Sequence, residues 1–395
     1  MEQNQTPDRP RRRSPYQRNR ALQGKYLTWL LVGTVVLFAV LGFLWQDREF
    51  SESENRKLAQ FPVFSLSSVK DGSFLKGLGD YAADQFPGRD MWISLNLQMN
   101  KLLGQKEVSG VFLCEDDYLM QIPGEPNETQ LQRNLDAINA FGETYSNLNI
   151  VMSVVPNAVT VHAEKLPEYA PVRDQKADLE GIMAEVTGAK FVDVTPILRE
   201  NRNQQLFYRT DHHWTSLGAY TAFQQIGPEL GIAVPSAEQY TVYTVSNGFE
   251  GTLSSKSGSH SAFDRVEIYV PDTDIEYYVT YAGEQTGICS MYKREALNNK
   301  DHYTVFFGGN YSRVDITTTA NTERNLLIFK DSYANCFVQF LYPYFDHITM
   351  IDPRYYYDNV ANAIKSESIT DVLYLYNLDT FLSDSSLADV LATGN

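Results

Sequence analysis

The chain has 395 residues, of which 43% are hydrophobic and 21% are charged, so it holds enough apolar material for a sizeable folded core. Its net charge of −16 is unevenly distributed: residues 1–25 carry seven basic and two acidic side chains, and the rest of the chain carries a net charge of −21. Because nucleic-acid binding requires a basic face, this acidic body argues against a nucleic-acid partner.

A stretch of twenty residues without charge, Tyr26 to Trp45, follows the basic tail. As a helix it would span about 30 Å, the hydrocarbon thickness of a bilayer. A cleaved signal peptide would have a shorter apolar region and a site of small residues after it, whereas Gln46-Asp47-Arg48 follows here. We therefore expect an uncleaved transmembrane helix over 26–45. The upstream arginines favour a cytoplasmic tail over 1–25 and a body outside the cytoplasm.

The region after this helix, 46–106, reads as a charged linker that becomes partly helical and is interrupted at Pro87-Gly88. The main domain is expected from Glu107 to the end of the chain. It opens with a hairpin over 108–120, in which three consecutive acidic residues, 115–117, suit the turn.

Short apolar strands then alternate with amphipathic helices, which is typical of a mostly parallel sheet covered on both faces. The predicted strands are 150–155, 191–194, 326–329, 348–351 and 372–376, and the predicted helices are 129–141, 175–187, 215–226, 359–366 and one that begins at Tyr333. Residues 240–320 differ, being rich in Tyr, Thr, Ser and Gly, and are expected to form a β-rich insertion.

The segment Asp211-His212-His213-Trp214 contains two of the six histidines of the chain. An aspartate beside a histidine can orient the imidazole and stabilise its charged form, which is half of a hydrolase-type triad. Ser332 offers the nucleophile, because it follows the predicted strand 326–329 and precedes a predicted helix. That position presents the hydroxyl at the carboxyl edge of the sheet, where α/β folds bind ligands. A helix-capping serine is the plainer interpretation.

The block from Arg209 to Thr215 resembles the signature of the DHHW family of membrane-anchored surface proteins. Three other segments agree with this resemblance: Glu54-Asn55-Arg56, Phe86-Pro87-Gly88-Arg89-Asp90 and Gly251-Thr252-Leu253. That family is similar to the alginate O-acetyltransferase group, so the resemblance, over roughly residues 50 to 380, implies an SGNH-hydrolase-like fold. Lys330 stands where SGNH hydrolases have the glycine of their Gly-Asp-Ser motif.

The family's Asp-x-His pattern falls on Asp211 and His213, which implies that His213 deprotonates Ser332 and that Asp211 holds its tautomer. His212 is the competing base. If the segment is extended, positions 211 and 213 face one way and 212 the other, which favours His213.

Three further residues are candidates for substrate binding. Asn157 follows the strand 150–155 at the same sheet edge, and Asn310, in Gly308-Gly309-Asn310, resembles the oxyanion-hole donors of SGNH enzymes. Both are more often plain turn residues. Trp214 could stack on a substrate, although a core anchor is the commoner role for such a residue.

A metal site is the rival chemistry, because aspartate and histidine are ligands for zinc and manganese. Asp211-His212-His213 also resembles the Asp-His-His of a phosphoesterase family, but the Asp-rich motifs near the N-terminus that this family needs are missing. The three cysteines show no metal-binding spacing, and the sequence does not decide whether two of them form a disulfide. We therefore expect neither a metal nor another cofactor.

These features favour a membrane-anchored, extracytoplasmic O-acyltransferase or esterase acting on a cell-surface polysaccharide. The relatives imply acetyl chemistry and a membrane-bound acyltransferase that supplies acetyl groups. The alternatives are a non-catalytic cell-envelope protein with a degenerate SGNH-like domain, and a metal-dependent hydrolase. The polymer, the acyl donor, the oligomeric state and the choice between transfer and hydrolysis are left open by the sequence.

Overall fold

The computed structural model describes residues 15–51, 53, 56–282 and 287–393. Residues 1–14 of the expected basic tail, and Glu54-Asn55, lie outside the described residues. The chain divides into two compact units, the first formed by residues up to 51 together with 56–93, and the second by 52–55 together with 94–395.

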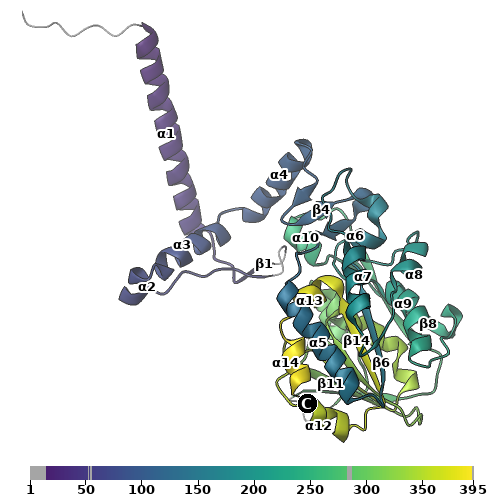
Figure 1. The fold of residues 1–395 in the computed structure, drawn as a ribbon. Helices are drawn as coiled ribbons and strands as arrows, with labels where there is room; N and C mark the ends of the chain where they lie inside the picture. Colours follow the sequence, from purple (N-terminus) through teal and green to yellow (C-terminus); the bar gives the residue numbers. More distant parts are fainter. Residues whose placement is uncertain (1–14, 52, 54–55, 283–286, 394–395) are drawn as a thin grey trace, which may run out of the picture. The chain divides into compact units, whose positions relative to one another are not determined.

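The first unit begins with a single long helix, α1 (Pro15–Leu44), within which Leu22–Gly42 is long and apolar enough to cross a membrane. This segment overlaps the transmembrane helix predicted over 26–45 (Figure 1). The expected linker folds into short elements, and its helical part is interrupted at Pro87-Gly88 as predicted. The elements are β1 (Phe50–Ser51), β2 (Arg56–Lys57), α2 (Leu66–Lys70), α3 (Ser73–Asp84) and α4 (Arg89–Leu102), of which α4 continues into the second unit.

The second unit is built around a seven-stranded sheet with the strand order β10-β11-β13-β12-β14-β6-β7. The five strands from β13 to β7 run parallel, and β10 and β11 extend one edge in antiparallel fashion. The strands are β6 (Asn149–Val155), β7 (Lys190–Phe191), β10 (Tyr277–Tyr281), β11 (Arg313–Thr318), β12 (Asn325–Lys330), β13 (His347–Ile351) and β14 (Asp371–Asn377). The central strands are continuous apolar runs in the sequence. Such runs suit strands of a parallel sheet, because both faces of that sheet are covered by helices.

Alternate residues of the central strands enter two separate cores. Val151 and Leu373 pack on one face with α9 and α11, whereas Met152 and Val372 pack on the other with α5, α7 and α12 to α14. Figure 1 shows α5, α13 and α14 gathered over the latter face. The α-helices of this unit after α4 are α5 (Glu128–Thr144), α6 (Ala158–Val161), α7 (Gln175–Glu185), α8 (Thr195–Glu200), α9 (Ser216–Glu229), α10 (Thr252–Ser257), α11 (Tyr333–Phe337), α12 (Val360–Ser366), α13 (Leu378–Ser383) and α14 (Leu387–Ala392). The α/β fold class and the two-faced covering are confirmed.

Short elements complete the second unit. The expected hairpin over 108–120 is part of a three-stranded sheet of β3 (Glu107–Val108), β4 (Val111–Leu113) and β5 (Leu119–Gln121), with its predicted turn in the 3₁₀ helix Glu115–Asp117. The region 240–320 contains a separate hairpin of β8 (Tyr240–Phe249) and β9 (Asp264–Pro271). The other two strands of the region 240–320, β10 and β11, belong to the central sheet. The predicted strand 191–194 is reduced to β7. Further 3₁₀ helices are Ala163–Lys165, Ala237–Gln239, Arg294–Asn298, His302–Val305, Val338–Phe340 and Tyr342–Tyr344.

Helix α5 approaches the loop before β7 so closely that only glycine fits at the contact. A Cβ atom added to Gly142 would lie 2.1 Å from the carbonyl oxygen of Gly188, and one added to Gly188 would lie 2.5 Å from the carbonyl oxygen of Ile138. Both obstacles are backbone atoms, so rotation of a side chain cannot relieve the clash.

We therefore expect Gly142→Ala to lower the free energy of unfolding by about 1–3 kcal/mol, the usual cost of overpacking. Gly181→Ala is the matched control, because nothing lies within 4 Å of a Cβ at that exposed position in α7. It should raise stability by about 0.5–1 kcal/mol, since alanine restricts the unfolded chain more than glycine. Thermal unfolding of the detergent-solubilised chain measures both, and equal shifts would contradict the close contact.

Candidate active site

Ser332 lies at the carboxyl end of the central strand β12, between the ends of β13 and β14. It caps α11 with helical backbone angles (φ −67°, ψ −17°), and its side chain makes no capping bond to that helix. The capping interpretation of Ser332 is therefore wrong for its side chain. The hydroxyl is instead available at the edge where α/β sheets hold their ligands.

Ser332, His213 and Asp211 form one continuous hydrogen-bonded chain. The Ser332 Oγ lies 2.7 Å from His213 Nε2, and the His213 Nδ1 lies 2.5 Å from Asp211 Oδ1. His213 and Asp211 are nearly inaccessible, with exposed fractions of 7% and 2%. The serine and the histidine are 119 residues apart in the chain. This is the arrangement of a nucleophile, a base and the carboxylate that orients the base.

The carboxylate of Asp211 is fully used as an acceptor. Oδ1 also accepts from the backbone N–H of His213, at 3.0 Å, and Oδ2 accepts from the backbone N–H and the hydroxyl of Thr252, at 2.7 and 2.8 Å. Gly251 allows this approach, because a Cβ there would lie 2.2 Å from the Asp211 Cβ. Burial on its own raises the pKa of Asp211, but the neighbouring imidazoles and these hydrogen bonds outweigh it and hold the pKa below its usual value.

The imidazole of His213 is held between two rings. Tyr303 stacks on it, with centroids 3.8 Å apart and planes inclined by 13°, and the ring of His212 lies 3.9 Å away. The Tyr303 hydroxyl donates to the carbonyl oxygen of Ser332, at 2.8 Å, so one tyrosine contacts both the imidazole of His213 and the backbone of Ser332. These contacts restrict rotation of His213 and keep its Nε2 facing Ser332.

His212 occupies a different environment from His213. Its Nδ1 lies 2.8 Å from the Thr252 hydroxyl, and its side chain is 33% exposed. Burial, followed by the charge of His213, lowers the pKa of His212 to about 4. The local backbone is a series of bends before Trp214 and is not extended, so the condition of the alternation argument is not met. His213 nevertheless faces Ser332, because the carbonyl oxygen of His213 accepts from the N–H of Tyr208, at 3.1 Å, and this closes the turn.

Asp331, the residue before Ser332, is fixed by backbone donors. Its two oxygens accept from the N–H groups of Tyr333, at 2.9 Å, and Asn377, at 2.8 Å. Burial raises the pKa of this carboxyl. The N–H of Tyr333, at the start of α11, is therefore engaged by Asp331 and is not available to bind an oxyanion.

Lys330 ends β12 inside the protein, with an exposed fraction of 1%. Its Nζ donates to the side-chain oxygens of Asn335, at 2.8 Å, and Asn310, at 3.2 Å, and lies 3.8 Å from an oxygen of Asp352. Burial lowers the pKa of this amine to about 8. The Asn335 amide also donates to the Asn310 oxygen, at 3.2 Å. Two donors, Lys330 Nζ and Asn335 Nδ2, therefore bind the side-chain oxygen of the exposed Asn310. The N–H₂ group of Asn310 points away from these two donors.

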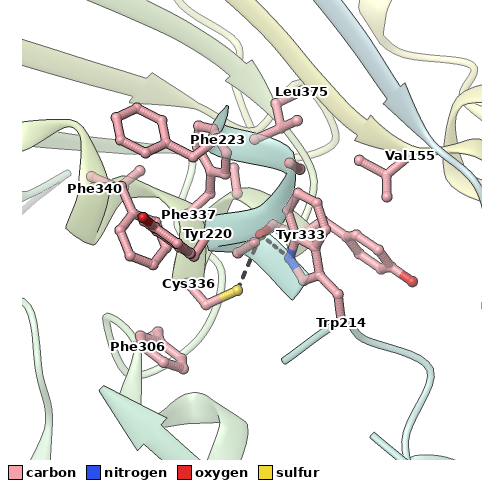
Figure 2. Packing of buried hydrophobic residues seen from close by; sticks show 14 of the residues in the cluster. Val155, Trp214, Tyr220, Phe223, Phe306, Tyr333, Cys336, Phe337, Phe340 and Leu375 are labelled. Carbon is pink, nitrogen blue, oxygen red and sulfur yellow. Dashed lines mark hydrogen bonds between the residues drawn. The ribbon is translucent and has the colours of Figure 1, made fainter. Parts of the chain in front are cut away.

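Two of the residues we expected at the substrate lie inside the protein. Asn157 is 6% exposed, and its amide is bonded to Asp379, Gln175 and Asn377. Trp214 is completely buried, and its indole N–H donates to the carbonyl oxygen of Tyr333, at 3.0 Å (Figure 2). Both positions argue against contact with a substrate. Trp214 is the core anchor that the plainer interpretation predicted.

Among the residues that the structure describes, two groups have metal-ligand chemistry. In the first group, Asp211, His212 and His213, the ligand atoms lie within 4.8 Å of one another. These atoms already have hydrogen-bond partners: His213 is bonded to Ser332 and Asp211, and His212 to Thr252. In the other, formed by Asp315, His347 and Glu367, the guanidinium of Arg313 binds both carboxylates, at 2.7 and 2.8 Å. Hydrogen bonds and ion pairs account for both arrangements.

The structure adds three residues to the site that the sequence reasoning did not place there: Thr252, Tyr303 and Lys330 in its anchoring role. Thr252 lies in Gly251-Thr252-Leu253, a segment that the family resemblance had marked without a function. Tyr303 belongs to a short 3₁₀ helix, His302–Val305, and nothing in its local sequence separates it from the other tyrosines.

Comparisons with known families cover much of the chain. The model for an SGNH hydrolase-like domain, acetyltransferase AlgX, matches residues 115–289, and the DHHW protein model matches residues 54–135. Asp211 and His213 lie inside the first match, whereas Ser332 lies beyond both.

Curated relatives are the probable alginate O-acetylases AlgJ of Pseudomonas species. The protein of Pseudomonas syringae pv. tomato is 26% identical over 221 residues, which cover 50% of this chain and 54% of the relative. That of Pseudomonas aeruginosa is 22% identical over 184 residues, covering 44% and 47%. The chain thus spans about half the length of the curated relatives it matches.

Solved structures share the fold. A DHHW family protein from Eubacterium siraeum is 25% identical with a TM-score of 0.62, covering 72% of this chain and 96% of that protein. Bacillus cereus PatB1, solved with a sulfonyl adduct, is 22% identical with a TM-score of 0.58, covering 69% and 96%. The chain therefore contains segments that match the DHHW protein model and the SGNH hydrolase-like domain model, and it is similar in sequence to the probable alginate O-acetylases AlgJ.

Proposed function

We propose that this protein is a membrane-anchored, extracytoplasmic O-acetyltransferase or esterase that uses Ser332 as its nucleophile. The observation that carries the proposal is the unbroken chain from Ser332 Oγ through His213 to Asp211. Its relationship to O-acetylases supports an acetyltransferase-like role in general. The serine-dependent mechanism rests on the geometry of the site.

In the proposed reaction, Ser332 Oγ attacks the carbonyl carbon of an acetyl ester while His213 Nε2 takes the hydroxyl proton. The tetrahedral intermediate then collapses to an acetyl-serine, and His213 returns the proton to the departing alcohol. A second hydroxyl repeats these steps in reverse order: a sugar hydroxyl gives transfer, and water gives hydrolysis. Asp211 stabilises the imidazolium in both halves, because its carboxylate remains ionised and bonded to Nδ1.

The developing oxyanion needs donors that are not already engaged. The backbone N–H of Ser332 and the N–H₂ group of Asn310 are the two we assign to it. Lys330 and Asn335 support this assignment, because they hold the carbonyl oxygen of Asn310 and so turn its N–H₂ group outward. Lys330, in place of the glycine of Gly-Asp-Ser, thereby becomes a positioning residue.

The proposed substrate follows from the chemistry of the site and from sequence similarity to known proteins. The relatives named as alginate O-acetylases suggest a polysaccharide as the acceptor. An activated cytoplasmic acyl donor is charged and cannot cross a bilayer unaided, whereas the proposed site lies outside the cytoplasm. We therefore propose a separate membrane-bound acyltransferase as the supplier of acetyl groups.

The triad should act as a unit. Ser332→Ala, His213→Ala and Asp211→Asn are each expected to lower kcat/KM for a small acetyl ester by about 10⁴-fold or more. His212→Ala is the matched control and should cost about tenfold or less, the equivalent of one lost ring contact. Hydrolysis of p-nitrophenyl acetate measures all four. A loss at His212 as large as at His213, or activity that a chelator removes, would favour the metal alternative.

Labelling by an electrophile separates catalysis from a purely structural role. A sulfonyl fluoride or fluorophosphonate should modify Ser332 in the parent chain, because both reagents select activated nucleophiles. His213→Ala should remain folded and lose the label. PatB1 has been solved with a sulfonyl adduct, which recommends this reagent class. A parent chain that resists the reagents would support a non-catalytic cell-envelope protein.

Removal of the proposed oxyanion donor should affect the chemical step. Asn310→Ala is expected to lower kcat by about 10²–10³-fold with little change in KM, as for other oxyanion-hole donors. Asn298→Ala, at another exposed asparagine, is the control and should retain parental kinetics. Steady-state kinetics on the same ester measure both, and an unchanged kcat for Asn310→Ala would remove that residue from the mechanism.

The proposed topology places the basic tail inside the cell and the body outside. Protease added to intact cells should therefore digest the body and spare an N-terminal tag, because arginines next to an apolar span stay in the cytoplasm. Permeabilised cells provide the control, in which the tag is digested as well. A body that is protected in intact cells would contradict this topology.

A further inference from the structure

The turn between α3 and α4 packs against the end of the apolar helix α1. The ring of Phe86 stacks on that of Phe38, with centroids 5.0 Å apart, and the ring of Trp92 lies 6.2 Å from it. Pro87 lies 4.0 Å from the Cβ position at Gly42. Phe38 and Gly42 both belong to the candidate membrane span Leu22–Gly42. The turn therefore reaches the level of the last apolar residues of this span.

Large apolar side chains of this turn remain uncovered. Met91 is 61% exposed, Trp92 40% and Phe86 38%, although all three lie within seven residues of one another. Clusters of this kind on a soluble protein mark contact with another apolar phase. A tryptophan beside a membrane span also suits the interface between lipid and water, where its ring is buried and its N–H remains hydrated.

The charged residues around the turn are paired. Arg48 binds Asp90 through two hydrogen bonds of 2.8 and 3.2 Å, and Arg56 binds Asp84 through two of 2.9 and 2.5 Å. The hydrogen bond from Arg56 lowers the pKa of Asp84 to about 2, so this carboxylate stays ionised and bound. Paired charges tolerate a region of low dielectric better than single ones.

Hydrogen bonds also fasten the turn to the chain that leaves α1. The side-chain oxygen of Gln85 accepts from the backbone N–H of Arg48, at 3.0 Å, and its amide donates to the backbone oxygen of the same residue, at 2.8 Å. The Tyr81 hydroxyl donates to both carboxylate oxygens of Asp47, at 3.0 Å each. The turn therefore stays beside the end of the membrane span.

We propose that Phe86, Met91 and Trp92 insert into the interfacial layer of the bilayer that α1 crosses, making the α3–α4 turn a second membrane contact. We assign this contact to lipid because the apolar side chains of the turn continue the lipid-facing surface of α1. The contact fixes the direction in which residues 46–93 leave the membrane, which a single helix does not. The inference rests on the proposed anchor and is independent of the catalytic triad.

Quenching by brominated lipid tests the proposal on the full-length chain. Replacing Trp29 and Trp45 with Phe leaves Trp92 and the completely buried Trp214 as the emitting residues. In vesicles of pure phosphatidylcholine, bromines near the head groups should quench Trp92 more strongly than bromines near the bilayer centre. Adding Trp92→Phe is the matched control and should abolish the quenching. Met91→Glu should weaken it and shift the Trp92 emission to the red.

A third chain, in which Trp29 remains and Trp45 and Trp92 are replaced, reports insertion of α1. Quenching of Trp29 without quenching of Trp92 would overturn the proposal and leave the anchor standing. Shielding of Trp92 only in native membranes would overturn it in favour of a partner protein. An unquenched Trp29 would remove the anchor and this inference together, whereas ester hydrolysis by the same vesicles tests the triad separately.

Discussion

The buried carboxylate of Asp211 is the interaction on which the candidate active site depends. It orients His213 from one side and receives the backbone and the hydroxyl of Thr252 from the other, so it joins two segments 41 residues apart. A buried carboxylate is stable only with such a complete set of donors. The bonds that stabilise the charge of Asp211 therefore also fix the position of His213. The same contacts are needed for a stable fold and for a preorganised site.

The sheet supplies the other half of the site. Strand β12 is central, flanked by parallel strands on both sides, and it ends at Lys330, which Asp331 and Ser332 follow directly. Each of these three residues is used: the lysine holds Asn310, the aspartate holds two backbone N–H groups, and the serine faces His213. Replacing the expected glycine by a buried lysine is compatible with the turn, because its amine finds three oxygen partners inside the protein.

Much of the architecture follows from local sequence. The alternation of short apolar runs with amphipathic helices predicted the parallel sheet, and the charge-free stretch predicted the membrane-spanning candidate that is found among the described residues. The predicted helix 215–226 is α9, which Thr215 caps by accepting from the N–H of Gly218. The sequence also named Asp211, His213 and Ser332 as candidates, because few residue types can provide a base, its orienting acid and a nucleophile, and the structure brings their side chains within hydrogen-bond distance. These features depend on periodicity and residue type, which the sequence states directly.

Contacts between distant segments could only be decided by the tertiary structure. Tyr303 is one of 25 tyrosines, and its role comes from stacking on His213, ninety residues away in the chain. Burial of Asn157 and Trp214, and the edge position of β10 and β11 in the central sheet, likewise depend on which surfaces meet. The sequence by itself determined which groups could react and which segments could form strands, helices or a membrane span. Packing decided which of those groups meet, because distances across a fold are set by the whole core and not by local spacing.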